Sequence, residues 1–231
     1  MIATMIAFAC LAVFASLYLF WRNVWFFRNP DRTVPPEGSG ILSPADGTVV
    51  YVKEMKPGES VINIKRGMEA TLNDITREDI DRPKLLIGIF MSPFNVHYNR
   101  MPVSGKISFS HHYPALPQNL CMFSMHLRTL FRRAPFYKNS RHIVVNERTI
   151  TRIDGEYRGR KLGCYVVQIA AKSVAGIDVF LREGARARAG EIFGMIRIGS
   201  QVDLVVTPLE GMNVKVCPGQ KVKAGETVLI D

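Results

Sequence analysis

A continuous apolar stretch at the N-terminus constrains this chain more than any other feature. Ile2 to Phe20 is 19 residues long and carries no charged side chain. At 1.5 Å per residue a helix of this length covers roughly 28 Å, which is close to the thickness of a bilayer's hydrocarbon core. The stretch therefore predicts a helix that spans or lies in a membrane.

Aromatic and basic residues follow the apolar stretch and indicate its orientation. They are Trp21, Arg22, Trp25, Phe26, Phe27 and Arg28. Aromatic rings favour the headgroup level of a bilayer, and a basic flank stays on the cytoplasmic side. A cleaved signal peptide is the alternative, but it requires a positive N-terminal region, and this chain has no Lys or Arg before residue 22. We therefore expect a retained anchor over residues 1–28, at the cytoplasmic face of the cell membrane.

After the anchor the chain reads mostly as short β-strands. A Pro- and Gly-rich linker over residues 29–42 precedes a domain of residues 43–231. Helical patterning is confined to Ala70–Asp79 and Ala171–Glu183, and residues 110–140 read as a long loop with some helix. The expected fold is mainly β, within the α+β class. The predicted strands are 47–53, 84–91, 105–110, 141–146, 163–170, 191–197, 202–207 and 227–230.

Two segments far apart in the sequence share one order of features. Residues 43–61 read as a turn with Pro and an acidic residue before Gly, a Val-rich strand, a Pro-Gly turn and a second strand, and residues 207–222 repeat this order. Paired halves of this kind look like biotinyl/lipoyl-like hammerheads, which form a flattened β-barrel or sandwich with pseudo-twofold symmetry. The turn is common by itself, but the shared order favours a structural repeat.

The charge balance points to an anionic partner. Lys and Arg number 30 against 20 Asp and Glu, giving a net charge of +10, and this suits nucleic acid, a membrane surface or an acidic substrate. The densest basic run, Arg128–Arg141, interleaves basic and aromatic side chains that suit either stacked bases or anionic lipid. Because the same chain carries a membrane anchor, we favour lipid and expect no nucleic-acid partner.

Cysteine and histidine spacing gives no metal pattern. The four cysteines lie far apart without a Cys-x-x-Cys spacing, which favours reduced thiols over disulfides or a zinc site. The five histidines lack ligand spacing, and no phosphate loop, dinucleotide or serine-hydrolase motif is present. We therefore expect no metal.

A Gly-Ser pair interrupts a run that otherwise reads as buried β-structure. Gly199-Ser200 lies between two apolar strands, whereas the other Gly-Ser pair, Gly38-Ser39, lies in the linker. Glycine permits an unusual backbone conformation there. A serine hydroxyl close to the Gly199 carbonyl carbon is able to attack it, and elimination would then break the chain and leave a pyruvoyl group. A tight turn between strands is the simpler alternative for these two residues.

Five blocks of sequence together identify a family resemblance. They are Phe26–Pro30, Ser43–Gly47, Phe90–Gly105, Asn146–Arg148 and Gly194–Ser200. In this order and over most of the chain, they resemble the short, pyruvoyl-dependent type of the phosphatidylserine decarboxylase family, which includes archaetidylserine decarboxylases. The last three blocks in combination are specific.

The resemblance implies a reaction and a cofactor that the chain makes itself. Self-cleavage between Gly199 and Ser200 would give a membrane-associated β chain of residues 1–199 and an α chain of residues 200–231, held as an αβ heterodimer, with further oligomerisation left open. Ser200 would become a covalent pyruvoyl group that forms a Schiff base with the substrate amine. The implied reaction converts phosphatidylserine to phosphatidylethanolamine and carbon dioxide.

Four further residues are candidates for the chemistry that the resemblance implies. His97 is the candidate for proton transfer, because imidazole titrates near neutral pH; the alternative is a strand histidine satisfied by backbone groups. Asp46 is a candidate to orient a base or assist Ser200, and otherwise forms a turn before Gly47. Arg100 and Arg66 are candidates to bind the lipid phosphate or the substrate carboxylate.

Three departures from the family pattern stand out. Longer members carry a second His three residues after the first, where this chain has Arg100, so the base that activates Ser200 stays open. A basic stretch expected after Ala170 is replaced by residues 171–177, and Gln201 stands where Arg or Thr is commoner. These changes leave the lipid preference open, including diacyl against ether chains.

Two other functions compete with the decarboxylase interpretation. A non-enzymatic membrane adaptor built on lipoyl-like halves would explain the repeat and the anchor without using Ser200. A basic nucleic-acid-binding protein would explain the charge alone. Cleavage at Ser200 separates both from the enzyme.

Overall fold

The N-terminal apolar stretch forms one long helix in the computed structural model of the chain. Helix α1 (Ile2–Asn23) is followed by the 3-10 helix η1 (Trp25–Phe27), and no residue of α1 is buried. Among the residues that the structure describes, the segment Ile2–Phe27 is the one helical stretch with the length and apolar character to cross a membrane. The predicted helix is therefore confirmed.

The structure describes residues 1–64, 68–71, 81–138, 140–172, 176–197 and 199–231. They divide into two units, Met1–Asp31 and Arg32–Asp231. The second unit, which we call the β unit, is mostly strand, with helices α3 (Phe123–Leu130) and α4 (His142–Val145). Its strands are β1 (Ile41–Leu42), β2 (Gly47–Met55), β3 (Ser60–Ile64), β4 (Met68–Thr71), β5 (Lys84–Met91), β6 (Tyr98–Arg100), β7 (Gly105–Tyr113), β8 (Arg148–Tyr157), β9 (Arg160–Ala170), β10 (Ile177–Val179), β11 (Arg186–Ala187), β12 (Ile192–Ile196), β13 (Ser200–Val206), β14 (Lys221–Val222) and β15 (Val228–Ile230).

An eight-stranded antiparallel sheet forms the centre of the β unit. Its strand order is β11-β7-β8-β9-β13-β5-β2-β14, and smaller sheets are formed by β10-β12-β6, β1-β15 and β3-β4. Every residue of β5 and of β13 is buried. Both faces of these strands are therefore covered, which explains why β5 reads as a nearly continuous apolar run.

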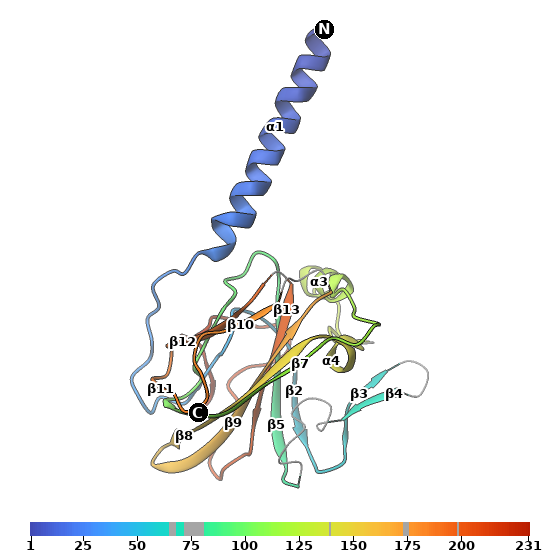
Figure 1. Ribbon diagram of the computed structural model, residues 1–231. Coiled ribbons are helices and arrows are strands. Elements are labelled where there is room, and N and C mark those ends of the chain that lie inside the picture. The colour runs from blue at the N-terminus through green and yellow to red at the C-terminus, as the bar shows by residue number, and fades with distance from the viewer. Residues whose placement is uncertain (65–67, 72–80, 139, 173–175, 198) are drawn as a thin grey trace. The chain divides into compact units, whose positions relative to one another are not determined.

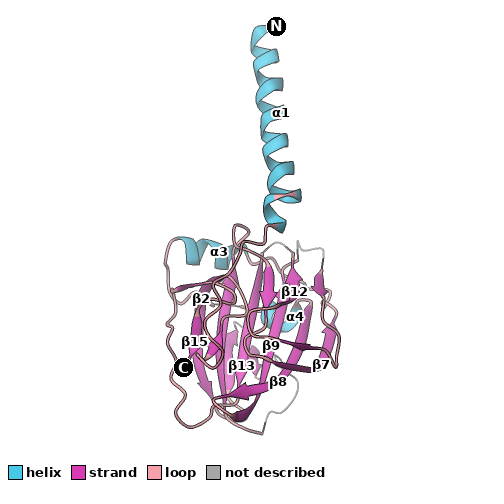
Figure 2. Ribbon diagram, turned by 90° about the vertical axis from the view of Figure 1, so that its left-hand side faces the viewer, coloured by secondary structure: helices cyan, strands magenta, loops and turns pink. Residues whose placement is uncertain are grey.

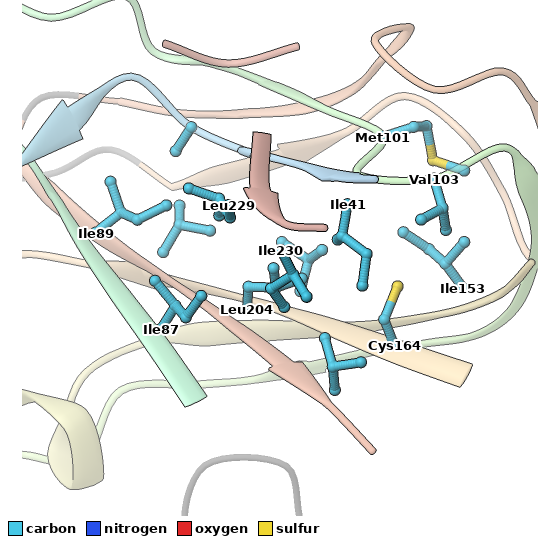
Figure 3. Close-up of a cluster of buried hydrophobic side chains, with 14 of the residues drawn as sticks. Ile41, Ile87, Ile89, Met101, Val103, Ile153, Cys164, Leu204, Leu229 and Ile230 are labelled. Atoms are coloured by element: carbon cyan, nitrogen blue, oxygen red, sulfur yellow. The ribbon is translucent and has the colours of Figure 1, made fainter. Parts of the chain in front are cut away.

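The first face of the large sheet packs against the small sheets. Ile87, Ile89 and Leu204 of the large sheet share a buried cluster with Ile41 of β1 and Ile230 of β15 (Figure 3). Strand β12 contributes further apolar side chains to the same cluster. This core therefore joins the beginning and the end of the β unit.

The second face of the large sheet packs against the two helices. Tyr51, Phe90 and Tyr165 form a cluster with Met125 of α3 and Ile143 of α4. Strand side chains alternate between the two faces, so neighbouring residues of β13 lie in different cores.

The two segments with the same order of features are joined by a strand pair. Strand β2 of the first segment pairs antiparallel with β14 of the second. Strands β1 and β15, which lie just outside the two segments, also pair antiparallel. Glycine permits the close approach of β2 to its other neighbour, β5, since a Cβ at Gly47 would stand 2.3 Å from the Phe90 carbonyl oxygen. The mainly β, α+β fold is confirmed. The described strands form open sheets, so the closed barrel of two hammerhead halves stays a prediction.

The strand predicted over residues 141–146 is wrong. The β-branched run Ile143–Val145 favours a strand locally, but these residues belong to α4. The guanidinium of Arg148 donates to the carbonyl oxygens of Ile143 and Val144, at 2.5 and 3.1 Å. Burial of Ile143 in the second core and these tertiary hydrogen bonds outweigh the local preference.

The predicted helices also need correction. Within Ala171–Glu183 the described residues contain β10, which pairs with β12, and no helix. Within Ala70–Asp79 the first two residues belong to β4, and residues 72–80 lie outside the described part of the chain. Strand β8 had no predicted counterpart, because its polar residues hide the strand pattern. The loop 110–140 contains the end of β7 and α3.

Replacing Gly88 with Ala is expected to destabilise the β unit by about 2 kcal/mol. A Cβ at residue 88 would stand 2.4 Å from the Tyr51 ring, and Tyr51 is buried with its hydroxyl hydrogen-bonded to Asp203. Gly163→Ala is the matched strand control, because its Cβ would meet nothing closer than 3.6 Å. Urea unfolding measures both variants, and equal losses would contradict this packing.

Candidate active site

The Gly199–Ser200 bond lies where the central strand β13 begins. Ser200 pairs with Met91 of β5 on one side and Ala170 of β9 on the other, and its side chain is fully buried. Gly199 has a φ of +67°, which an L-residue with a side chain adopts only with strain. The unusual backbone conformation expected at Gly199 is therefore present.

The hydroxyl of Ser200 contacts a sulfur atom. Its Oγ lies 3.4 Å from Sδ of Met91, and a thioether is a weak acceptor. In the part of the chain described, no N–H or O–H group donates a hydrogen bond to this oxygen. Its lone pairs are therefore not engaged in a hydrogen bond.

A pair of buried amide side chains, Asn99 and Gln168, contacts this sulfur through Asn99, and neither residue was predicted. Nδ2 of Asn99 lies 3.8 Å from Sδ of Met91, and Oδ1 of Asn99 accepts a 2.8 Å hydrogen bond from Gln168. Asn99 also reaches the carbonyl oxygen of Pro44 at 3.4 Å. The sulfur of Met91 thus lies between Ser200 and an uncharged, buried cluster of amide groups. In the sequence, Asn99 lies within the family block Phe90–Gly105, and Gln168 lies in the predicted strand 163–170.

His97 is buried and its tautomer follows from one hydrogen bond. Its Nδ1 lies 2.9 Å from the carbonyl oxygen of Asn95. A carbonyl oxygen only accepts, so Nδ1 carries the proton and Nε2 is the basic nitrogen of the neutral ring. The loop is fixed by Asn95, whose Oδ1 accepts from the backbone N–H and the hydroxyl of Ser92 at 2.8 and 2.7 Å.

The loop of residues 92–97 is attached to the chain on both sides of the Gly199–Ser200 bond. Before the loop, Met91 pairs with Ser200. After it, the carbonyl oxygen of His97 accepts a hydrogen bond from the backbone N–H of Ile196, at 3.2 Å. The structure therefore brings the His97 loop and Ser200 into one region.

Asp46 occupies an ionic cluster instead of a contact with Ser200. Its carboxylate accepts from Arg32 at 3.0 Å and from the backbone N–H of Ala224 at 2.8 Å. Glu226 lies 4.0 Å from the same Arg32 guanidinium. Asp46 therefore joins residues near the start of the β unit to the C-terminal segment.

Arg100 lies beside this cluster. It donates to the carbonyl oxygen of Gly190 at 2.7 Å and is 9% exposed. Burial lowers the pKa of the Arg100 guanidinium, and the charge of Arg32 lowers it further, against the opposite effect of Asp46 and Glu226. The other arginine candidate, Arg66, lies outside the described residues.

A second polar network, which the sequence did not reveal, occupies the opposite face of β13. Nε2 of Gln201 donates to the Tyr51 hydroxyl and to Asp203, both at 2.7 Å, and Tyr51 donates to Asp203 at 2.8 Å. Oε1 of Gln201 accepts from Nε2 of His142 at 2.8 Å. The residue that departs from the family pattern therefore joins three other buried side chains.

Burial sets the protonation states of this network. It raises the pKa of Asp203 to about 7, with hydrogen bonds from Gln201 and Tyr51 acting in the opposite direction. The second carboxylate oxygen of Asp203 is buried without a hydrogen bond, which explains why desolvation prevails. Burial lowers the pKa of His142 to about 4, so the ring is neutral.

Comparison with known proteins gives a consistent result. A family model described as phosphatidylserine decarboxylase matches residues 19–230. A protein of Methanocaldococcus jannaschii named as an archaetidylserine decarboxylase proenzyme is 34% identical, over 93% of this chain and 90% of that protein. Phosphatidylserine decarboxylase proenzymes of Paramagnetospirillum magneticum and Chlorobium limicola are 35% and 32% identical, over 90% and 94% of this chain and 70% and 82% of theirs.

Asp203→Asn is expected to change how stability depends on pH. Because folding raises the pKa of Asp203 from 3.8 to about 7, its contribution is fully present below pH 4 and is lost as the pH rises through 7. Relative to the parent, the variant should gain up to about 4 kcal/mol between pH 4 and pH 8. Denaturant unfolding across this range measures the difference. The exposed Asp154→Asn serves as control, and a pH-independent difference for Asp203→Asn would refute the expectation.

Proposed function

The chain belongs to the phosphatidylserine decarboxylase family, and we propose that it converts a serine phospholipid to the ethanolamine phospholipid and carbon dioxide. The observation that carries this proposal is the Gly199–Ser200 bond, which lies at the start of a buried central strand with Gly199 at a φ of +67°. An ordinary turn between strands does not require a fully buried serine. The names of the relatives, which are proenzymes, agree with a chain that is processed.

We propose that Ser200 is the precursor of a pyruvoyl group. The surroundings suit a small carbonyl group, because Ser200 is fully buried next to the amide cluster of Asn99 and Gln168. When present, a pyruvoyl group supplies a carbonyl that condenses with the substrate amine and withdraws electrons as carbon dioxide leaves. Asn99 and Gln168 would border it and exclude water from it.

Self-cleavage uses atoms that the chain already provides. Oγ of Ser200 bonds to the carbonyl carbon of Gly199, the peptide C–N bond breaks, and the hydroxyl proton passes to the freed nitrogen, which gives an ester. Removal of the α-proton of residue 200 then expels the Gly199 carboxylate and leaves dehydroalanine. Water replaces the nitrogen, which leaves as ammonia, and a ketone remains. The weak contact of Oγ with Met91 leaves the nucleophile available.

His97 is the proposed proton donor and acceptor in turnover. Its Nδ1–H is committed to the carbonyl oxygen of Asn95, so Nε2 is the atom that gains and loses the proton. Asp46 and Arg32 are proposed to hold the C-terminal segment in place through Ala224. Arg100, and Arg66 outside the described residues, remain candidates to bind the anionic groups of the lipid.

The cleaved chains are proposed to stay together as an αβ heterodimer. Strand β13 of the α chain lies between β9 and β5 of the β chain, with seven residue pairs on each side. All seven residues of β13 are buried, so the hydrophobic effect retains the α chain after the bond is broken.

We propose that residues 1–28 anchor the enzyme at the cytoplasmic face of the cell membrane, with residues 29–42 as linker and residues 43–231 as the decarboxylase domain. Support comes from the apolar helix α1 and the basic residues that follow it. The anchor would keep the enzyme where its lipid substrate is found.

Ser200→Ala is expected to abolish processing, because alanine has no hydroxyl to attack Gly199. Denaturing electrophoresis and mass spectrometry should show one chain of 231 residues, whereas the parent gives chains of residues 1–199 and 200–231. Ser39→Ala is the matched control, since it removes the serine of the other Gly-Ser pair. Normal processing of Ser200→Ala would refute the cleavage assignment, and an unprocessed parent chain would favour the adaptor.

His97→Ala is expected to lower turnover by about 100-fold or more, the usual effect of losing a positioned acid–base group. Carbon dioxide release is measured per processed chain, with processing quantified separately by mass spectrometry. His111→Ala is the control, because that ring is exposed. Unchanged turnover per processed chain in His97→Ala would exclude the proposed proton transfer.

A further inference from the structure

Helix α3 turns an apolar face to solvent. Phe123, Leu127, Leu130 and Phe131 follow a helical period of four, three and one residues, which places them on one side of the helix. Their exposed fractions are 61%, 36%, 62% and 62%. Large apolar side chains that are exposed together indicate an interaction site, whereas scattered ones do not.

The other side of α3 is fixed to the β unit. Met122 and Met125 are buried in the cluster that contains Phe90. The His126 ring also lies near Phe90, with 6.3 Å between ring centroids. Helix α3 is therefore packed through its methionine side, and its exposed apolar face is a second, separate face of the same helix.

Four basic side chains flank the apolar face. They are Arg128, Arg132, Arg133 and Lys138, the last three of which are exposed. In the described part of the chain none of the four forms an ion pair with a carboxylate. Residues 84–146, which are 63 residues, contain no Asp or Glu at all. The four apolar and four basic side chains together are called the α3 surface below.

A hollow of about 620 Å³ opens between these two kinds of side chain. Its lining includes Arg128, Arg133 and Lys138 on the basic side, and Leu127 and Phe131 on the apolar side. A cavity with cations beside apolar groups matches a phospholipid, whose phosphate adjoins its acyl chains.

The α3 surface lies at the same end of the large sheet as the Gly199–Ser200 bond. The backbone N–H of Lys172 donates to the carbonyl oxygen of Leu120 at 3.0 Å, and Ala170, two residues earlier, pairs with Ser200. Figures 1 and 2 show α3 at one end of the strands. Phe94, in the turn after Met91, is a further exposed apolar residue near this end, at 65%.

We propose that the α3 surface docks onto an anionic lipid bilayer. The apolar face enters the boundary between headgroups and acyl chains, while the four cations contact lipid phosphates. A second copy of the chain would bring four cations against four, and nucleic acid would gain nothing from the exposed leucines. Charge complementarity and the mixed basic and apolar lining of the hollow therefore both favour lipid.

This contact adds to the anchor a second attachment of the same chain. Two attachments joined by a linker bind more tightly than either alone, because the second binds at high effective concentration. Docking of α3 also turns the Ser200 end of the sheet toward the bilayer. That this bilayer holds the substrate rests on the proposed function. Docking itself requires no enzymatic activity.

Hydrogen–deuterium exchange of the full chain in lipid nanodiscs tests the docking. The Ser200→Ala chain is used alongside the parent, so that failure of processing does not affect the result. Amide exchange in residues 123–138 should slow on the order of tenfold in phosphatidylcholine mixed with phosphatidylglycerol, relative to phosphatidylcholine alone. Added salt should reduce the protection.

Charge reversal supplies the matched comparison. The triple variant Arg132→Glu, Arg133→Glu and Lys138→Glu should lose the protection, because each basic residue near an anionic surface contributes roughly a fivefold change in binding. The control triple variant Lys106→Glu, Lys161→Glu and Arg186→Glu makes the same change in net charge at exposed positions. These residues lie toward the opposite end of strands β7 and β9, so the control should keep the protection.

Three results would overturn the proposal. The first is equal exchange of residues 123–138 in the two lipids. The second is equal loss of protection in the two triple variants, which would make net charge alone responsible. The third is protection that depends on protein concentration and not on lipid, which would assign the surface to a second copy of the chain. If the processed parent chain does not decarboxylate a serine phospholipid but still shows lipid-dependent protection, the proposed function is refuted and the docking proposal stands.

Discussion

The burial of strand β13 is the constraint on which the rest of the structure depends. The strand is hydrogen-bonded on both sides, to β5 and β9, and all of its residues are buried. A bond that breaks at its first residue therefore leaves the strand held by the rest of the sheet. A proenzyme that cleaves itself needs such a position, because the new chain end must stay where the scissile bond was. Placed in a surface loop, the same Gly-Ser pair would leave the new end free to move.

The alternation of a β-strand gives β13 two different polar sites. Ser200 contacts Met91, whose sulfur also contacts Asn99 of the Asn99–Gln168 amide cluster. The next residue, Gln201, points to the opposite face, where it bonds to Tyr51, Asp203 and His142. Gln201, which departs from the family pattern, thus follows Ser200 in the chain but directs its side chain to the other face of the sheet. Substitutions at this position would change the support of the strand and not the chemistry directly.

Local sequence patterns predicted an element correctly where all of its residues lie in the same environment, either exposed or buried, or where a turn required particular residues. The helix over the apolar stretch and the strand over residues 84–91 both follow from continuous apolar runs, and the structure contains them. Patterns failed where tertiary contacts compete with local preference. Residues 142–145 are β-branched in part but form α4, because Arg148 bonds to their carbonyl oxygens. Strand β8 is rich in polar residues and forms a strand because it pairs with β7 on one side and β9 on the other.

The residues alone establish the family resemblance, the apolar helix, the excess of positive charge and the Gly199–Ser200 bond, because each depends on residue type and order along the chain. Partners that are distant in sequence emerge only when the chain folds. Asn99 meets Gln168, Asp46 meets Ala224, and Gln201 meets His142. The exposed side of α3 is likewise decided by packing, since periodicity marks an apolar face but does not say whether the core covers it. Here a second core covers the methionine side, and the phenylalanine and leucine side is left to water or to lipid.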